Sequence, residues 1–83
     1  MVLRLSPFLK GVAPRTPYKN LGRNMKRLRV GLELTQERAA EKAGISLKYW
    51  QALEAGSKAP TFSTLCRIRK VISASWEQLC KDC

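Results

Sequence analysis

The chain has 83 residues, of which 16 are lysine or arginine and 6 are aspartate or glutamate, so its formal net charge is +10. This length predicts one small domain, and such a basic excess favours a polyanionic partner, either nucleic acid or an anionic membrane surface. Histidine is absent and cysteine occurs three times, which argues against a histidine base in catalysis and against a disulfide framework.

Residues 1–19 contain three prolines and four basic residues without an acid. Prolines at this density argue against a regular helix, so we expect a flexible basic arm. The arm could follow the DNA backbone or enter the minor groove, or it could be a tail without a role. Residues 1–13 are partly apolar, but this run is too short and too interrupted for a signal peptide or a membrane span. We therefore expect an intracellular protein.

A first helix is predicted over residues 20–31, followed by a short link. Its apolar residues recur at helical spacing, and they are Leu21, Met25, Leu28 and Leu32. Basic residues line the other sides, and from these we expect Arg27 to contact a DNA phosphate. Arg29 is unusual because it lies beside the apolar stripe, where an unpaired charge is costly.

Residues 35–56 predict two short helices joined by a tight turn. Thr35 and Ser46 are suitable N-caps, and Gly44 and Gly56 can take the left-handed conformation that ends a helix. Between them lie the apolar residues expected to face inward, which are Ala39, Ala40, Ala43, Trp50 and Leu53. This is the layout of a helix-turn-helix, whose second helix enters the DNA major groove.

The remaining residues predict two more helices. The first spans residues 61–72, and its expected core stripe is Phe62, Leu65, Ile68 and Ile72. Ser75 and Gln78 have capping-box spacing for a helix over residues 76–81, in which Trp76 would complete the core or cover a dimer contact. Cys80 and Cys83 follow that helix, whereas redox pairs begin one, and too few ligands remain for structural zinc. We therefore expect no metal and no cofactor.

In this order the elements resemble the Cro/repressor-type (Xre-like) helix-turn-helix domains of phage and bacterial regulators. The resemblance runs from about residue 21 to residue 79 and rests on Leu34-Thr35-Gln36, Ala39-Ala40, Ala43-Gly44-Ile45-Ser46, Tyr49-Trp50, Leu53-Glu54-Ala55-Gly56, Lys58-Ala59-Pro60-Thr61 and Leu65. Trp50 departs from the family's usual isoleucine or valine, which should alter packing more than function. The implied fold is all-α, a compact five-helix bundle of the lambda-repressor-like type over residues 20–83.

The helix-turn-helix layout and the family resemblance together assign the site residues. The residues expected to face DNA bases are Ser46, Leu47, Lys48, Gln51 and Ala52. The resemblance implies phosphate contacts from Gln36, Tyr49 and Lys58, although Tyr49 could serve packing alone. It also implies an ion pair between Arg29 and Glu54, for which the alternative is a surface arginine that snorkels.

The expected function is sequence-specific binding of double-stranded DNA by a transcriptional regulator. We expect a repressor that acts as a homodimer on a pseudo-palindromic operator, in the cytoplasm of a bacterium or phage host and associated with the nucleoid. Glu37 and Glu41 could contact RNA polymerase, as some members of the resembled family do, or form an ordinary solvated face. The alternative function is an antitoxin-like module that neutralises a partner protein. No nucleophile and base come together in the sequence, so we expect no enzyme.

Overall fold

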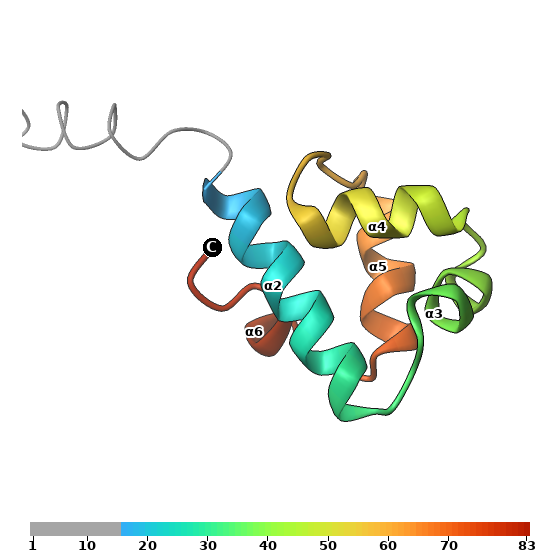
Figure 1. Cartoon of the computed structure of the whole chain (residues 1–83). Helices are drawn as coiled ribbons and strands as arrows, with labels where there is room; N and C mark the ends of the chain where they lie inside the picture. The colour runs from blue at the N-terminus through green and yellow to red at the C-terminus, as the bar shows by residue number, and fades with distance from the viewer. Residues whose placement is uncertain (1–15) are drawn as a thin grey trace, which may run out of the picture.

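The computed structural model describes residues 16–83, and this part of the chain forms five helices and no strand (Figure 1). The helices are α2 (Thr16–Gly31), α3 (Gln36–Ala43), α4 (Leu47–Ala55), α5 (Phe62–Val71) and α6 (Trp76–Leu79). The prediction of a compact all-α bundle is therefore confirmed. No helix among the described residues is both long enough and apolar enough to span a membrane.

The first described helix begins earlier than the sequence pattern indicated. It starts at Thr16, four residues before the predicted start. Pro17 thus falls in the first turn, where a missing N–H costs no helical hydrogen bond. The expectation that prolines exclude a helix up to residue 19 is wrong for residues 16–19, while the predicted arm over residues 1–15 lies outside the described part.

The predicted caps of α3 and α4 are confirmed. The Thr35 hydroxyl accepts the N–H of Arg38, and the Ser46 hydroxyl accepts the N–H of Tyr49, both at 3.0 Å. Gly44 and Gly56 end α3 and α4 with φ values of 73° and 78°, in the left-handed region that glycine tolerates best. The capping box of α6 forms as expected, although α6 ends at Leu79, before the predicted residue 81.

The core lies between α4 and the helices around it. Its largest fully buried side chains are Trp50, Met25, Leu53, Ile68 and Leu79. The three alanines of α3 are also buried, and their small size lets α3 pack closely against α4 and α5. Burial of Trp50 and Leu53 on one side of α4 leaves its opposite side open to solvent.

Three apolar residues are more exposed than their spacing predicted. Leu32 is 46% exposed because α2 ends at Gly31 and the leucine belongs to the link. Phe62, the first residue of α5, is 72% exposed. Its ring stacks on Trp76, which is itself 38% exposed and so does not complete the core. The core assignments of Leu32 and Phe62 are therefore wrong.

Two contacts made by α2 were not predicted from the sequence. Gly22 lies against the end of α4, where a Cβ atom would come within 2.3 Å of the Glu54 carbonyl oxygen. Asn24 donates from Nδ2 to the carbonyl oxygens of Leu79 and Lys81, both at 2.8 Å, and so holds the C-terminal residues against α2. Together these contacts fix α2 between α4 and α6.

Candidate nucleic-acid interface

The solvent side of α4 presents the residues predicted to face DNA bases. Ser46, Leu47, Lys48 and Gln51 are exposed, and Ala52 is half-buried. Ala55 is also exposed on this helix, although no DNA contact was predicted for it. Because Trp50 and Leu53 anchor the opposite side, these side chains share one continuous surface on a helix that the core holds in place.

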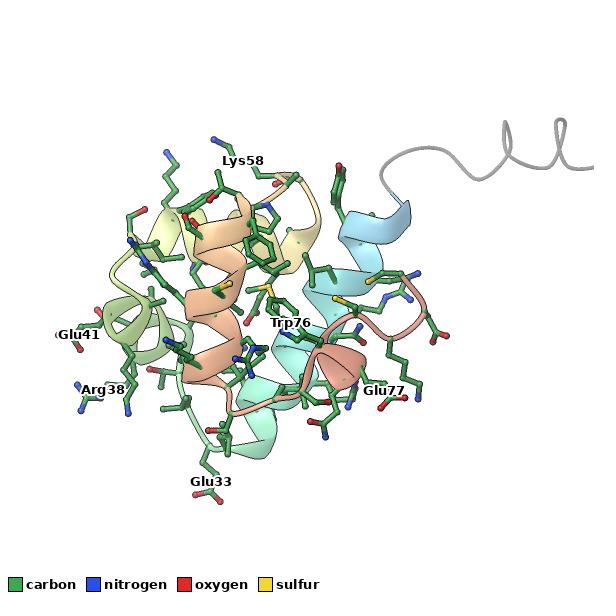
Figure 2. All side chains as sticks on the ribbon, turned by 180° about the vertical axis from the view of Figure 1, so that it is seen from behind. Glu33, Arg38, Glu41, Lys58, Trp76 and Glu77 are labelled. Carbon is green, nitrogen blue, oxygen red and sulfur yellow. The ribbon has the colours of Figure 1, made fainter. Side chains whose placement is uncertain are left out.

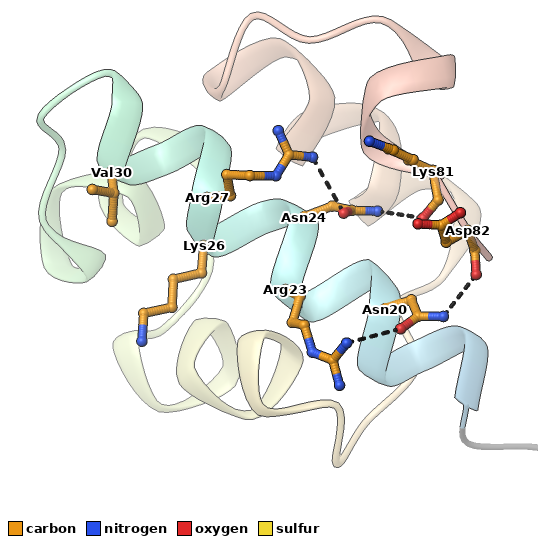
Figure 3. Close-up of a pocket in the computed structure, with 8 residues that line it drawn as sticks. All are labelled: Asn20, Arg23, Asn24, Lys26, Arg27, Val30, Lys81 and Asp82. Carbon is orange, nitrogen blue, oxygen red and sulfur yellow. Dashed lines mark hydrogen bonds between the residues drawn. The ribbon is translucent and has the colours of Figure 1, made fainter.

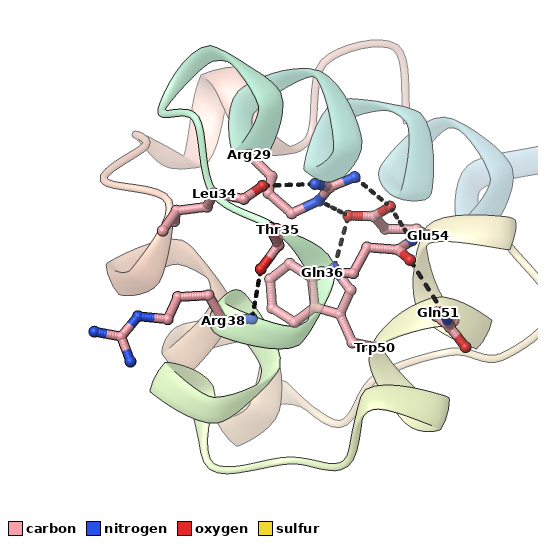
Figure 4. Close-up of polar contacts among 8 residues, drawn as sticks. All are labelled: Arg29, Leu34, Thr35, Gln36, Arg38, Trp50, Gln51 and Glu54. Atoms are coloured by element: carbon pink, nitrogen blue, oxygen red, sulfur yellow. Dashed lines mark hydrogen bonds and ion pairs between the residues drawn. The ribbon is translucent and has the colours of Figure 1, made fainter.

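The Glu54 carboxylate fixes the C-terminal end of α4 to two other helices (Figure 4). Its oxygens accept from Arg29 Nε at 2.6 Å and from Arg29 Nη2 at 3.2 Å. They also accept from Gln36 Nε2 at 2.9 Å and from Trp50 Nε1 at 2.6 Å. The side chains of Arg29 and Glu54 are 9% and 4% exposed, so the structure brings this predicted pair together in a nearly dry setting.

Arg29 also donates from Nη1 to the Leu34 carbonyl oxygen at 2.7 Å. This bond ties the link between α2 and α3 to the same cluster. Three of the five guanidinium N–H groups of Arg29 are thereby used, which offsets the cost of burying its charge. The role of Trp50 was underestimated from the sequence, because its indole N–H is a donor that isoleucine or valine would lack.

The environment of Glu54 favours its charged form. Burial alone would raise the pKa of Glu54, but hydrogen bonds from Arg29, Gln36 and Trp50 act with the Arg29 charge to lower it below its ordinary value. The carboxylate therefore stays ionised at neutral pH and keeps all of its donors engaged.

Gln36 connects this cluster to the solvent face of α4. Its Nε2 is held by Glu54, and its Oε1 accepts from Gln51 Nε2 at 3.2 Å. The family resemblance predicts a direct phosphate contact for Gln36. In the structure Gln36 also bridges the buried Glu54 carboxylate and Gln51, which is a predicted base contact. One N–H of the Gln36 amide remains for a phosphate.

The other predicted phosphate contacts lie at different places around α4. Lys58 projects into solvent from the turn between α4 and α5 (Figure 2). Tyr49 is half-buried against the core, consistent with a packing role for its ring. Both residues belong to α4 or to the turn that follows it, so they flank the exposed side of the helix.

Arg27 lies apart from these residues. At 100° per residue it is roughly 140° around α2 from Gly22, which faces α4. Figure 3 shows Arg27 and Lys26 leaving α2 in opposite directions, with Arg27 donating from Nη2 to Asn24 Oδ1 at 3.3 Å. The structure therefore does not bring Arg27 together with the exposed side of α4.

Lys19 lies nearer to α4, although the sequence analysis did not assign it a contact. A Cβ atom on Gly56 would approach the Lys19 Cα to 2.8 Å, so the N-terminal half of α2 packs against the end of α4. Lys26 lies roughly 40° from Gly22 on the helix, on the exposed side. Only the three-dimensional packing of α2 against α4 identifies these two lysines as neighbours of the predicted DNA face.

An open hollow of about 510 Å³ lies between α2 and the C-terminal residues (Figure 3). Its charged lining consists of Arg23, Lys26, Arg27, Lys81 and Asp82. The excess of cations gives this side of α2 the same sign of charge as the surface around α4. It thus extends the positive surface of the protein beyond the helix-turn-helix itself.

The acidic residues of α3 are exposed, and one of them forms a solvent-exposed ion pair. Arg38 Nη1 and Glu41 Oε1 are 2.9 Å apart, but their side chains are 62% and 71% exposed. An ion pair in that setting contributes little to stability because water screens it. Glu37 is exposed as well, and a contact of these acids with RNA polymerase stays a prediction.

The cysteines show no catalytic arrangement among the described residues. Cys80 and Cys83 are exposed free thiols, and Cys66 is half-buried. The small buried part of the exposed Cys83 thiol raises its pKa, and the neighbouring Cys80 and Asp82 raise the pKa further, so this thiol is not activated as a nucleophile. Within residues 16–83 no group of three histidine, cysteine, aspartate or glutamate residues could hold a metal ion.

Comparisons with known proteins agree with this geometry. A family model described as a helix-turn-helix domain matches residues 20–79. The uncharacterized HTH-type transcriptional regulator YqaE of Bacillus subtilis (strain 168) is 36% identical over 58 residues, which cover 70% of this chain and 50% of that protein. The chain thus spans half the length of this relative. No solved structure matches the chain described here. Because the family match extends over most of the chain, the protein belongs to the helix-turn-helix domain family.

Proposed function

We propose that the chain binds double-stranded DNA as the recognition domain of a transcriptional regulator. The observation that carries this proposal is the solvent face of α4, which is free of core contacts while Trp50, Leu53 and Glu54 fix the helix from behind. A rigid helix with a polar exposed face is what major-groove reading requires. Family membership and the name of the relative from Bacillus subtilis support the proposal.

In this proposal the face of α4 supplies base contacts, from Ser46, Leu47, Lys48, Gln51 and Ala52. Lys48 is suited to the acceptors of guanine, and Leu47 to the methyl group of thymine. Lys58, Tyr49 and the free N–H of Gln36 would position the domain on phosphates. Arg27 would reach only DNA that continues past α2, whereas Lys19 and Lys26 lie closer to the proposed path.

Gln51 is the proposed base contact with the most support from neighbouring side chains. Its donation to Gln36 Oε1 leaves one amide N–H and the Oε1 without a partner among the described residues. Those two groups match the N7 acceptor and N6 donor of adenine. We therefore propose Gln36 as a positioning residue that orients Gln51 for adenine, with Glu54 orienting Gln36 in turn.

The proposed mode of action is repression by a homodimer on a pseudo-palindromic operator. One small domain contributes too little interface for typical operator affinity, whereas two half-sites about 34–36 Å apart multiply it. A dimer bound at a promoter would exclude RNA polymerase. This assignment gives the protein a binding role and no catalytic step.

Selection of bound sequences from a random DNA pool, followed by salt titration, tests the proposal. We expect a defined sequence whose affinity falls steeply with salt. Lys48→Met should cost about 1–3 kcal/mol on the selected sequence and relax one base position, while Lys58→Met should weaken selected and scrambled DNA alike. Lys70→Met, an exposed lysine in the last turn of α5, is the matched control and should change neither.

Enrichment of no sequence, or equal and sequence-independent losses from Lys48→Met and Lys58→Met, would refute base reading by α4. A chain that binds no DNA but captures a protein partner in a salt-insensitive way would favour the antitoxin-like alternative.

A further inference from the structure

Two asparagines one turn apart on α2 bind the C-terminal residues along one wall of the open hollow (Figure 3). Asn20 Nδ2 donates to the Asp82 carbonyl oxygen at 2.7 Å, and Asn24 Nδ2 donates to the Lys81 carbonyl oxygen at 2.8 Å. Asn24 is only 8% exposed, so one of these two anchors is buried. The bonds join residues that are 62 and 57 positions apart in the sequence, so the hollow is a product of the fold.

The same asparagines accept hydrogen bonds from two arginines that line the hollow. Arg23 Nη1 donates to Asn20 Oδ1 at 3.5 Å, and Arg27 Nη2 donates to Asn24 Oδ1 at 3.3 Å. Both bonds are long and therefore weak. Each uses one of the five N–H groups of a guanidinium, so most donors of both arginines are available to a ligand.

The charges around the hollow are unbalanced. Arg23, Lys26, Arg27 and Lys81 bring four positive charges to the lining, against the single carboxylate of Asp82. The ion pairs found within residues 16–83 involve none of these five side chains. The two arginines are also like charges at i, i+4, a spacing that is mildly unfavourable until an anion lies between them. The lining therefore favours a ligand with more than one negative charge.

Phosphate is the anion that this lining suits best. A guanidinium binds phosphate oxygens through two parallel N–H bonds. Side chains four residues apart on a helix have Cβ atoms about 5–6 Å apart, so Arg23 and Arg27 can bind one phosphate group together or two adjacent groups. Lys26 and Lys81 add ammonium charges, which attract phosphate without a fixed geometry.

The size of the hollow suits a small molecule. Its volume of about 510 Å³ lies within the roughly 300–1,000 Å³ of small-molecule sites. Val30 lies at the C-terminal end of the lining on α2 and is 54% exposed, so it offers an apolar contact beside the charged part. Asp82 is the acid of the lining and can accept from a hydroxyl or amino group of the ligand.

The hollow lies on a different side of α2 from the proposed DNA face. At 100° per residue Arg23 and Arg27 are roughly 100° and 140° around the helix from Gly22, which faces α4. A duplex bound along α4 would leave the hollow open. A ligand in the hollow and a duplex along α4 would therefore not compete.

We propose that the hollow is a binding site for a small molecule that carries one or two phosphate groups, such as a nucleotide or a sugar phosphate. Arg23 and Arg27 bind the phosphate oxygens from α2, and Lys81 contributes its charge from the C-terminal wall. The ligand thereby joins α2 to the C-terminal residues and adds to the two asparagine anchors. This site is additional to the proposed DNA face and does not depend on it.

The first arm of the test adds inorganic pyrophosphate to the full chain at constant ionic strength. The side-chain amide signals of asparagine and glutamine in a nitrogen–proton spectrum report on separate places. The Asn20 and Asn24 signals should shift and saturate, with half-saturation below about 1 mM pyrophosphate. The Gln36 and Gln51 signals report on the proposed DNA face and should not follow the same curve. Asparagine signals that stay unchanged up to about 10 mM overturn the proposal.

A pair of double variants separates a specific site from general charge attraction. Arg23→Gln with Arg27→Gln should weaken pyrophosphate binding at least about tenfold, because hydrogen bonds from charged groups are lost. Arg67→Gln with Lys70→Gln is the matched control, since it removes the same charge from exposed positions of α5. The control should keep the affinity of the original chain. Equal losses in the two double variants would show that pyrophosphate follows net charge alone, which overturns the site.

The second arm decides whether the phosphate belongs to a small molecule or to the DNA backbone. The pyrophosphate titration is repeated with the chain saturated by a duplex of the selected sequence. We expect the Asn20 and Asn24 signals to shift along the same curve as without DNA. Displacement of pyrophosphate by the duplex would assign the hollow to the DNA backbone and overturn a separate small-molecule site. A chain that binds no DNA refutes the proposed function instead, and the first arm and the double variants then decide the site alone.

Discussion

At the scale of single residues, the Glu54 carboxylate links the rigidity of the fold to the proposed reading of DNA. It accepts from three side chains, each from a different part of the helix-turn-helix and its support. Arg29 belongs to α2, Gln36 begins α3, and Trp50 lies one turn before Glu54 on α4. One charge therefore sets the orientation of α4 and, through Gln36, that of Gln51.

This arrangement predicts how stability depends on pH. Because the pKa of Glu54 is lowered on folding, its contribution is fully present above its ordinary value of 4.5. It is lost as the pH falls from there through the folded-state pKa. Glu54→Gln should remove this part of the acid sensitivity. Urea unfolding at a series of pH values from 7 to about 3 measures the difference. Parallel pH profiles for the two proteins would contradict the prediction.

The same cluster predicts non-additive mutational losses. Arg29→Met or Glu54→Met alone should destabilise the fold by about 3–5 kcal/mol, because each change leaves an opposite charge buried and unpaired. The double change should recover part of that loss. A double-mutant cycle by urea unfolding measures the coupling. Strictly additive losses would show that the pair contributes nothing specific.

At the scale of the helices, the close approach of α2 to α4 depends on one glycine. Gly22→Ala should destabilise the fold even though alanine is the better helix former, because its Cβ would lie 2.3 Å from the Glu54 carbonyl oxygen. Gly31→Ala is the matched control. That position is helical with open space around it, so alanine should stabilise by up to about 1 kcal/mol. Thermal unfolding that ranks Gly22→Ala at or above the original chain would contradict this packing.

Helix ends were predictable from the sequence, whereas packing partners often were not. Thr35, Ser46, Gly44 and Gly56 act within four or five residues of their own position, so local chemistry determines their roles. The exposure of Phe62 depends on how the first turn of α5 lies against the rest of the domain, and periodicity alone cannot show that. The importance of Gly22 likewise depends on a helix more than 20 residues away in the sequence.

The same distinction applies to the candidate site. Spacing identified the exposed side of α4 because it lies opposite Trp50 and Leu53 on one helix. Spacing did not reveal the donation from Trp50 to Glu54 or the bridge from Gln36 to Gln51, since both depend on rotamers and on the packing between α3 and α4. Nor did it separate Arg27 from Lys19, because which side of α2 faces α4 is a tertiary property.

At the scale of the whole molecule, we propose that the net charge supplies general affinity for DNA and that the helical bundle positions the side chains that read sequence. In the proposed function, a net charge of +10 attracts DNA of any sequence, and Lys58 and the basic side of α2 would contribute to that attraction. In the proposed function, sequence preference comes from the few side chains on the exposed face of α4. The bundle holds that face in place through buried contacts on the opposite side of the helix.

Repeating the DNA selection with Gln51→Ala tests this account most directly, because Gln51 is the proposed base contact whose amide is hydrogen-bonded to Gln36 and, through it, to Glu54. We predict that the selected sequence keeps all but one of its preferred positions per half-site and loses an adenine preference at that one. The control variant must leave the fold and the proposed DNA face unchanged. Gln78→Ala fails this requirement because Gln78 caps α6, so the control is again Lys70→Met. Selection by Gln51→Ala of the same sequence as the original chain, with only a uniform loss of affinity, would contradict the claim that the exposed face of α4 reads DNA bases.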